Sequence, residues 1–209
     1  GDWLAFLDAD IEVPQQWLTL LLALHAQGHG DVFALDCDTP RQAPWFARAW
    51  QRRTLRAGQP TLHSMAWLPT PNLLMQRHWF EQVGGFDQNI FLFHEDDDLC
   101  LRLARHGRLA YATDIVVDHR YGSSTPRTDE LTRVRSWHLG FSRVYVIRKH
   151  HGRRAALISL LHAVLKFLSP EMISARGRIK ARAFFDGTRT ALVSTFEGAP
   201  FNSPNDLVM

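Results

Sequence analysis

The sequence has little cysteine and no long apolar run. Its 209 residues include two cysteines, Cys37 and Cys100, which are too few for a disulfide framework and lack the Cys-x-x-Cys spacing of a metal motif. We therefore expect a reducing compartment. No apolar run reaches the roughly 18 residues that a transmembrane helix requires. The 45% hydrophobic and 22% charged residues are typical of a folded globular protein.

Acidic residues are scarce toward the end of the chain. Residues 141–190 contain 11 Lys and Arg but 2 Asp and Glu, whereas residues 1–140 carry a net charge of −4. We expect these two parts to meet different partners. The chain opens with Gly1-Asp2-Trp3 and runs straight into an apolar segment, so we expect it to be the C-terminal part of a longer protein.

The hydrophobic pattern predicts a mixed α/β protein. Residues 3–7 form a short apolar run that favours a parallel strand buried on both faces. A helix follows with Pro14 at its first position and Gly28 beyond its end, and residues 32–36 form the next strand. Further strands are predicted at 64–68, 72–75, 109–113 and 115–117, and helices at 77–83, 97–106, 128–149, 155–168 and 170–191.

Two carboxylates, Asp8 and Asp10, end the first predicted strand. The carboxyl ends of strands are where open α/β sheets bind ligands, and hard oxygen ligands suit Mg²⁺ or Mn²⁺, which can hold a diphosphate. The alternative is an ordinary turn into solvent, where Asp is common.

A second acidic group runs from His94 through Glu95-Asp96-Asp97-Asp98. A helix start explains some of these carboxylates, because free backbone N–H groups and the helix dipole favour negative charge there. The remainder, crowded by like charge, could include one with raised proton affinity that acts as a general base. A third candidate is His119, which follows a strand and could reach a metal or phosphate, or could simply lie at the surface.

Taken in order, these stretches resemble glycosyltransferase family 2, and most closely its rhamnosyltransferase-like branch. The segments that carry the resemblance are Trp3-Leu4-Ala5-Phe6-Leu7-Asp8-Ala9-Asp10, Asn72-Leu73-Leu74-Met75, Gly84-Gly85-Phe86-Asp87, residues 93–103, and His119 with Gly122-Ser123. The ordered combination is specific, although no single segment is.

The resemblance implies the C-terminal portion of a GT-A (Rossmann-like) domain that binds a sugar nucleotide and a divalent ion, followed by C-terminal helices. It implies that Asp96 is the general base and that Asp8 and Asp10 bind the donor nucleotide. It also implies that Asp10 and His119 bind the metal, and that Glu95, Asp98 and Arg102 shape the acceptor site. Family members have a much longer segment before the first acidic pair, where seven residues precede Asp8 here. We therefore expect the N-terminal nucleotide-binding part to be missing and the isolated chain to bind donor poorly.

The expected domains are a catalytic part at 1–150, a basic amphipathic helical extension at 151–197 and a flexible tail at 198–209. Helix 155–168 has a wide apolar face flanked by Arg153 and Arg154, which suits either an anionic membrane interface or packing against the catalytic part. No aromatic-interleaved basic platform is present, so we expect no nucleic-acid partner.

The sequence thus predicts an inverting, metal-dependent hexosyltransferase-type glycosyltransferase. It would use Mg²⁺ or Mn²⁺ and transfer sugar from a nucleotide-sugar donor to a saccharide or lipid-linked acceptor in cell-surface polysaccharide synthesis. The expected location is cytoplasmic, peripheral on the inner face of the membrane. Two alternatives stay open: a metal-dependent nucleotidyltransferase, and a non-catalytic remnant that binds sugar or lipid.

Overall fold

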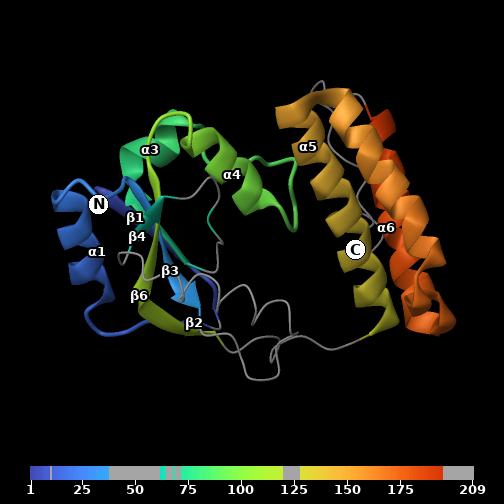
Figure 1. The fold of residues 1–209 in the computed structure, drawn as a ribbon, viewed down its shortest axis with the longest axis horizontal. Helices are drawn as coiled ribbons and strands as arrows, with labels where there is room; N and C mark the ends of the chain where they lie inside the picture. The colour runs from blue at the N-terminus through green and yellow to red at the C-terminus, as the bar shows by residue number, and fades with distance from the viewer. Residues whose placement is uncertain (10, 38–61, 65–67, 69–71, 120–127, 195–209) are drawn as a thin grey trace. The chain divides into compact units, whose positions relative to one another are not determined.

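The computed structural model describes residues 1–9, 11–37, 62–64, 68, 72–119 and 128–194. They form two compact units (Figure 1). The first unit holds Gly1–Gly85 and Leu99–Thr125, and the second holds Phe86–Asp98 and Pro126–Met209. The expected domain boundaries at residues 150 and 197 remain predictions, and the expected tail at 198–209 lies outside the described residues.

The first unit is built on a six-stranded sheet (Figure 1). The strand order is β1-β5-β3-β6-β2, and β4 pairs with β6 beside this path. The β5 strand is antiparallel to both of its neighbours, whereas β3 and β6 are parallel. The strands are β1 (Trp3–Leu7), β2 (Ile11–Glu12), β3 (Val32–Cys37), β4 (Leu62–Ser64), β5 (Asn72–Gln76) and β6 (Leu109–His119).

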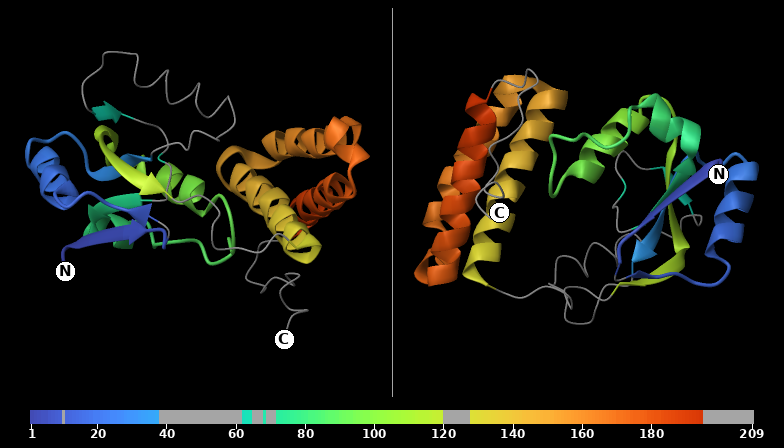
Figure 2. Two further views of the ribbon diagram at one scale, coloured as in Figure 1. Left: turned by 90° about the horizontal axis from the view of Figure 1, so that it is seen from below. Right: turned by 180° about the vertical axis from the view of Figure 1, so that it is seen from behind.

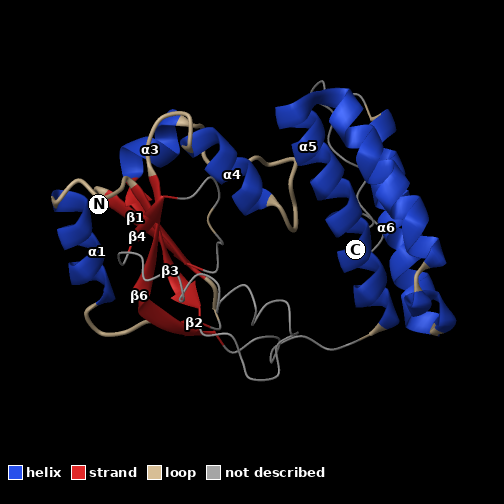
Figure 3. Ribbon diagram, viewed as in Figure 1, coloured by secondary structure: helices blue, strands red, loops and turns tan. Residues whose placement is uncertain are grey.

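Helices α1 (Trp17–Ala26) and α3 (Arg77–Gln82) accompany this sheet (Figure 3). The core joins α1 to three strands through Leu21, Phe33, Leu74 and Val117, which are almost fully buried. Pro14 lies before α1, which begins at Trp17, and the Pro14 carbonyl accepts a hydrogen bond from the Trp17 N–H. The mixed α/β class predicted from the sequence is confirmed.

The prediction of β1 as a parallel strand buried on both faces is wrong. It pairs antiparallel with β5, and part of the strand is exposed. Its two faces are apolar because they meet different helices. Trp3 makes an edge-on ring contact with His25 of α1, and Phe6 contacts the ring of Phe80 of α3. Side chains on successive strand residues point to opposite faces, so both faces need apolar residues whatever the direction of the neighbouring strand.

The second unit is mainly a pair of long helices, α5 (Asp129–Leu165) and α6 (Ala175–Val193), joined by the short 3-10 helices η1 (Lys166–Leu168) and η2 (Pro170–Ile173) (Figure 2). Gly152 interrupts α5 with a φ of 83°. This left-handed conformation favours glycine, and it separates the two helices that the sequence predicts at 128–149 and 155–168. Within the described residues, no helix combines the length and apolar character needed to cross a bilayer.

Close approach of α5 and α6 depends on two glycines. A Cβ on Gly140 would lie 2.2 Å from the Phe184 carbonyl oxygen, and a Cβ on Gly187 would lie 2.1 Å from the Trp137 carbonyl oxygen. Both distances are far inside van der Waals contact, so any side chain at either position would force the helices apart.

Candidate active site

A tight turn that begins at Asp8 follows β1. The N–H of Ile11 donates to the Asp8 carbonyl oxygen at 3.2 Å, which closes the turn, and the Asp8 side chain is exposed. Asp10 lies outside the described residues. The chain reverses here because Asp is favoured in turns, and the reversal leads directly into β2.

The strand register brings this turn to His119. β2 pairs antiparallel with β6, and Ile11, the residue after Asp10, is opposite His119. Because β1 and β3 are both antiparallel to β5, and β3 is parallel to β6, the carboxyl ends of β1, β3 and β6 face the same edge of the sheet. Open α/β sheets bind ligands at this edge.

The register therefore places the backbone of His119 beside Ile11, in the strand that follows the turn at Asp8, and the donor chemistry of the predicted ligands fits the ion. Carboxylates with one imidazole form a set that suits Mn²⁺ or Mg²⁺. The side chain of His119 is not among those described, and the described residues contain no group of three or more side chains able to hold a metal. The roles of Asp8, Asp10 and His119 as ligands stay predictions.

Asn72 fixes the sheet near the same edge. Backbone pairing of β3 with β5 covers Val32 and Phe33. Beyond it, the buried Asn72 side chain continues the pairing: its Oδ1 accepts from the Leu35 N–H, and its Nδ2 donates to the Leu35 carbonyl oxygen at 3.3 Å. The sequence analysis noted Asn72 as part of a matching segment but gave it no role. A polar residue beside three apolar strand residues was the available signal.

The second acidic group opens helix α4 (Glu95–Leu103), two residues before the predicted start. Phe93 and His94, directly before the helix, have φ values of 65° and 62°. Two consecutive non-glycine residues in the left-handed region are unusual and strained, a feature that often accompanies functional sites. All four carboxylates lie in the first turn of α4, where the helix dipole favours negative charge.

These carboxylates differ in their partners. Asp97 contacts the Nδ1 atom of His94, and Asp98 is tied to α5. Asp96 accepts a hydrogen bond from the Asp97 N–H at Oδ1, at 2.8 Å. Within the described part of the chain, no hydrogen bond reaches its Oδ2, and the residue is half-buried. Asp96 is thus the aspartate of this run whose described contact is with the backbone alone, whereas Asp97 and Asp98 each contact another side chain.

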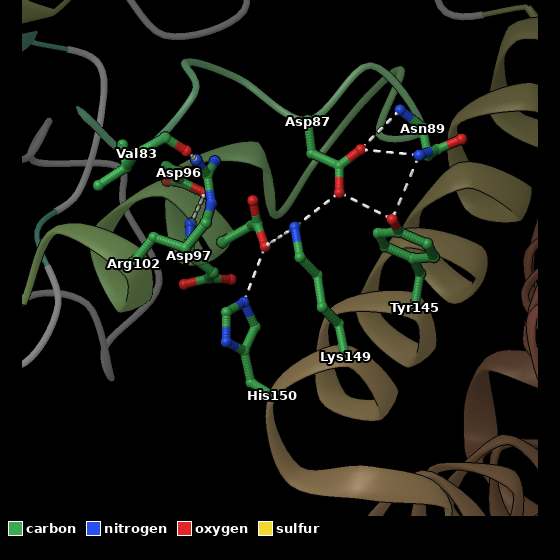
Figure 4. Close-up of polar contacts among 10 residues, drawn as sticks. Val83, Asp87, Asn89, Asp96, Asp97, Arg102, Tyr145, Lys149 and His150 are labelled. Carbon is green, nitrogen blue, oxygen red and sulfur yellow. Dashed lines mark hydrogen bonds and ion pairs between the residues drawn. The ribbon is translucent and has the colours of Figure 1, made fainter. Parts of the chain in front are cut away.

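Asp98 has no exposed side-chain area, and its charge is balanced by α5. The Lys149 ammonium lies 2.7 Å from Asp98 Oδ1, and His150 Nε2 lies 2.8 Å from the same oxygen. Figure 4 shows Lys149 and His150 extending from α5 into these contacts. A fully buried carboxylate requires such partners. The predicted acceptor-site role of Asp98 stays untested, and its contacts favour a positioning role.

Asp87 is the second carboxylate that Lys149 contacts (Figure 4). Its Oδ2 accepts from the Tyr145 hydroxyl and from Lys149, both at 2.7 Å, and its Oδ1 accepts from the Asn89 N–H at 2.9 Å. Burial alone would raise the pKa of Asp87, but the hydrogen bonds from Lys149, Asn89 and Tyr145 lower it to about 2. Burial and the bond to Asp87 raise the pKa of Tyr145 well above its usual value.

Arg102 lies in the last turn of α4. Its Nη1 donates to the Val83 carbonyl oxygen at 2.6 Å, at the end of α3 (Figure 4). The contact stabilises the end of α3, because a cation satisfies a carbonyl that the helix leaves without an internal partner. The predicted acceptor-site role of Arg102 stays untested.

Tyr145, Lys149 and His150 were not predicted from the sequence as parts of the site. One signal was available, because Tyr145 and Lys149 are four residues apart and so share one face of a helix. That spacing predicts a shared face but does not reveal the carboxylates that the face meets.

Comparison with known proteins identifies the family of similar sequences to which the chain belongs. The profile of the family described as "Glycosyl transferase family group 2" matches residues 3–192. Two curated relatives, from the CDC 1551 / Oshkosh and H37Rv strains of Mycobacterium tuberculosis, are both named N-acetylglucosaminyl-diphospho-decaprenol L-rhamnosyltransferase. Each is 33% identical over 110 residues, a match that covers 52% of this chain and 34% of the relative.

The chain thus matches about a third of the length of these relatives. Among solved structures, S. aureus TarS 1–349 in complex with UDP-GlcNAc is similar, with a TM-score of 0.45, 13% identity, and coverage of 92% of this chain and 67% of that one. The family profile spans nearly all of the sequence, including both acidic groups. The chain therefore belongs to glycosyl transferase family group 2.

Proposed function

We propose that the protein transfers a sugar from a nucleotide-sugar donor to a saccharide or lipid-linked acceptor, with inversion at the anomeric carbon, in cell-surface polysaccharide synthesis. Family membership supports the reaction class. The name of the mycobacterial relatives indicates a decaprenol-linked acceptor for those enzymes, which supports a lipid-linked acceptor here.

One observation supports Asp96 as the general base. Asp97 is engaged by the His94 side chain and Asp98 by Lys149 and His150, whereas Asp96 contacts only the Asp97 N–H among the described residues and keeps an oxygen that none of them engages. A base must present such an oxygen to the proton that it takes.

In the reaction, the acceptor hydroxyl oxygen attacks the anomeric carbon of the donor. The bond from that carbon to the diphosphate oxygen breaks, and its electron pair leaves with the nucleoside diphosphate. The acceptor proton passes to the Asp96 carboxylate. A correctly placed base typically contributes about 10²–10⁴ in rate.

Asp10 and His119, with Asp8 beside them, would hold Mg²⁺ or Mn²⁺. The support is the register that pairs Ile11 with His119 and the tight turn that the Asp8 carbonyl closes with the Ile11 N–H. When bound, such an ion neutralises the charge that develops on the leaving diphosphate.

Incubation of the full-length gene product with a panel of nucleotide sugars and lipid or saccharide acceptors tests the proposal. We expect acceptor-dependent release of nucleoside diphosphate and a product whose anomeric configuration, measured by NMR, is opposite to that of the donor. Release of inorganic pyrophosphate would instead indicate nucleotidyl transfer, and retained configuration would contradict inversion.

A further inference from the structure

The second part of α5, after Gly152, places its side chains in an unusual way. The residues that it buries are small, namely Ala156, Ser159 and Ala163. The large apolar residues are exposed, and Ile158 retains 70% of its accessible area. A helix that only packed on its neighbours would bury its large apolar face instead.

The exposed residues form one face. Helical positions 157, 158, 161, 164 and 165 fall within about a third of the circumference, because residues three and four apart share a side. Seven of the twelve exposed large hydrophobic residues found in the described ranges lie between 157 and 173. They are Leu157, Ile158, Leu161, Val164, Leu165, Leu168 and Ile173, and we call the first five, which belong to α5, the apolar face.

Two exposed cations lie directly before the apolar face. Arg153 and Arg154 precede it, are exposed and form no ion pair within the described part of the protein. Lys166 follows it, with its ammonium 4.0 Å from the centre of the Phe184 ring. Burial lowers the pKa of Lys166, Glu171 opposes this, and the nearby cations Arg143 and Lys180 lower it further. The exposed positive charge therefore lies at the end of this surface that carries Arg153 and Arg154, while the Lys166 ammonium lies over the buried Phe184 ring.

We propose that the apolar face docks on an anionic lipid surface. The face would lie at the boundary between headgroups and acyl chains, and Arg153 and Arg154 would contact lipid phosphates. Apolar area on one side of a helix combined with cationic flanks is the pattern of interfacial helices, and each Lys or Arg near an anionic surface strengthens binding. This inference goes beyond the proposed transfer reaction and does not depend on it.

Charge favours a membrane over a second copy of the chain as the occupant. Two copies that met through this face would bring together two segments of the same positive charge. Residues 141–190 carry a net charge of +9, so such a dimer would be opposed by like charge, whereas an anionic bilayer is complementary to it.

Flotation of the 209-residue chain with vesicles tests the proposal. We expect binding to phosphatidylcholine vesicles containing about 30% phosphatidylglycerol, and weak binding to phosphatidylcholine alone. Binding should fall as salt rises, because the Debye length shortens. The double variant Leu161→Ser/Leu165→Ser should lose at least about tenfold in partitioning, since it removes two apolar anchors.

The matched control is Leu18→Ser/Leu20→Ser, which changes two exposed leucines of α1. It should bind vesicles like the wild-type chain. Because all four leucines are exposed, both variants should fold, which circular dichroism verifies. Absence of binding to anionic vesicles, equal loss in both double variants, or a dimer in light scattering that Leu161→Ser/Leu165→Ser abolishes without any vesicle binding would overturn the proposal.

Discussion

The ammonium of Lys149 lies 2.7 Å from a carboxylate oxygen of Asp98, whose side chain has no exposed area. The same ammonium lies 2.7 Å from Asp87. One side chain of α5 thus holds both ends of the segment 87–98, which contains the strained residues before α4 and the proposed base, Asp96. This segment is therefore fixed by buried charge.

Replacing Lys149 by Met should destabilise the protein by about 3–5 kcal/mol, because it leaves a buried carboxylate without its cation. Chemical denaturation monitored by circular dichroism measures the change. Arg154→Met is the matched control, since Arg154 is exposed on the same helix and forms no described ion pair. Equal stability of the two variants would show that Asp98 does not need Lys149.

Stability should fall at acidic pH partly through Asp87. Its pKa is about 2 in the folded protein, against an ordinary value of 3.8. The ionised, hydrogen-bonded form stabilises the fold above the ordinary pKa, and this contribution is lost as pH falls from about 4 to 2. We compare the free energy of unfolding of the wild type with that of Asp87→Asn. The difference between the two should be about 1–2 kcal/mol larger at pH 6 than at pH 2. A difference that stays constant over this range would contradict the assignment.

The left-handed backbone at His94 predicts a specific order of stability. His94→Gly and His94→Val both remove the contact with Asp97, so their comparison isolates the backbone. The φ of residue 94 is 62°. The His94→Val variant should therefore be less stable than His94→Gly by about 1–3 kcal/mol, because a β-branched residue is strained in this conformation. Thermal unfolding measures the order, and equal midpoints would mean that residue 94 does not hold this conformation in solution.

The metal dependence of nucleotide binding tests the proposed role of Asp10 as a metal ligand. Asp10→Ala should weaken nucleotide binding in the presence of Mn²⁺ by at least about tenfold and have little effect in excess chelator. Titration calorimetry of the full-length gene product provides both values. Glu12→Ala, two residues further on in β2, is the control and should bind like the wild type. If both variants bind alike with metal present, Asp10 is not a ligand.

Local patterns predicted most elements of the fold. The apolar run at Val32–Cys37, the helix at Arg77–Gln82 and the break near Gly152 are all visible in the sequence, because each depends on neighbouring residues. The pairing of β1 was not predictable in the same way. Side-chain alternation reports which faces of a strand are apolar but carries no information on the direction of its partner.

The site was predicted in part, for a similar reason. The acidic groups stand out as short motifs, whereas the partner of Asp98 does not, since His150 lies 52 residues further along the chain. The sequence analysis treated all of the acidic run as candidates for chemistry or helix capping. Only packing against α5 distinguishes Asp98, which is buried and paired, from Asp96.

The most direct test of the proposed function is the turnover of Asp96→Asn. The substitution keeps the size of the side chain and an oxygen that can accept from the Asp97 N–H, but removes the proton acceptor. Measured with the full-length gene product, sugar transfer should fall at least about 10²-fold while donor affinity stays near the wild-type value. Wild-type turnover in this variant would contradict the assignment of Asp96 as the base.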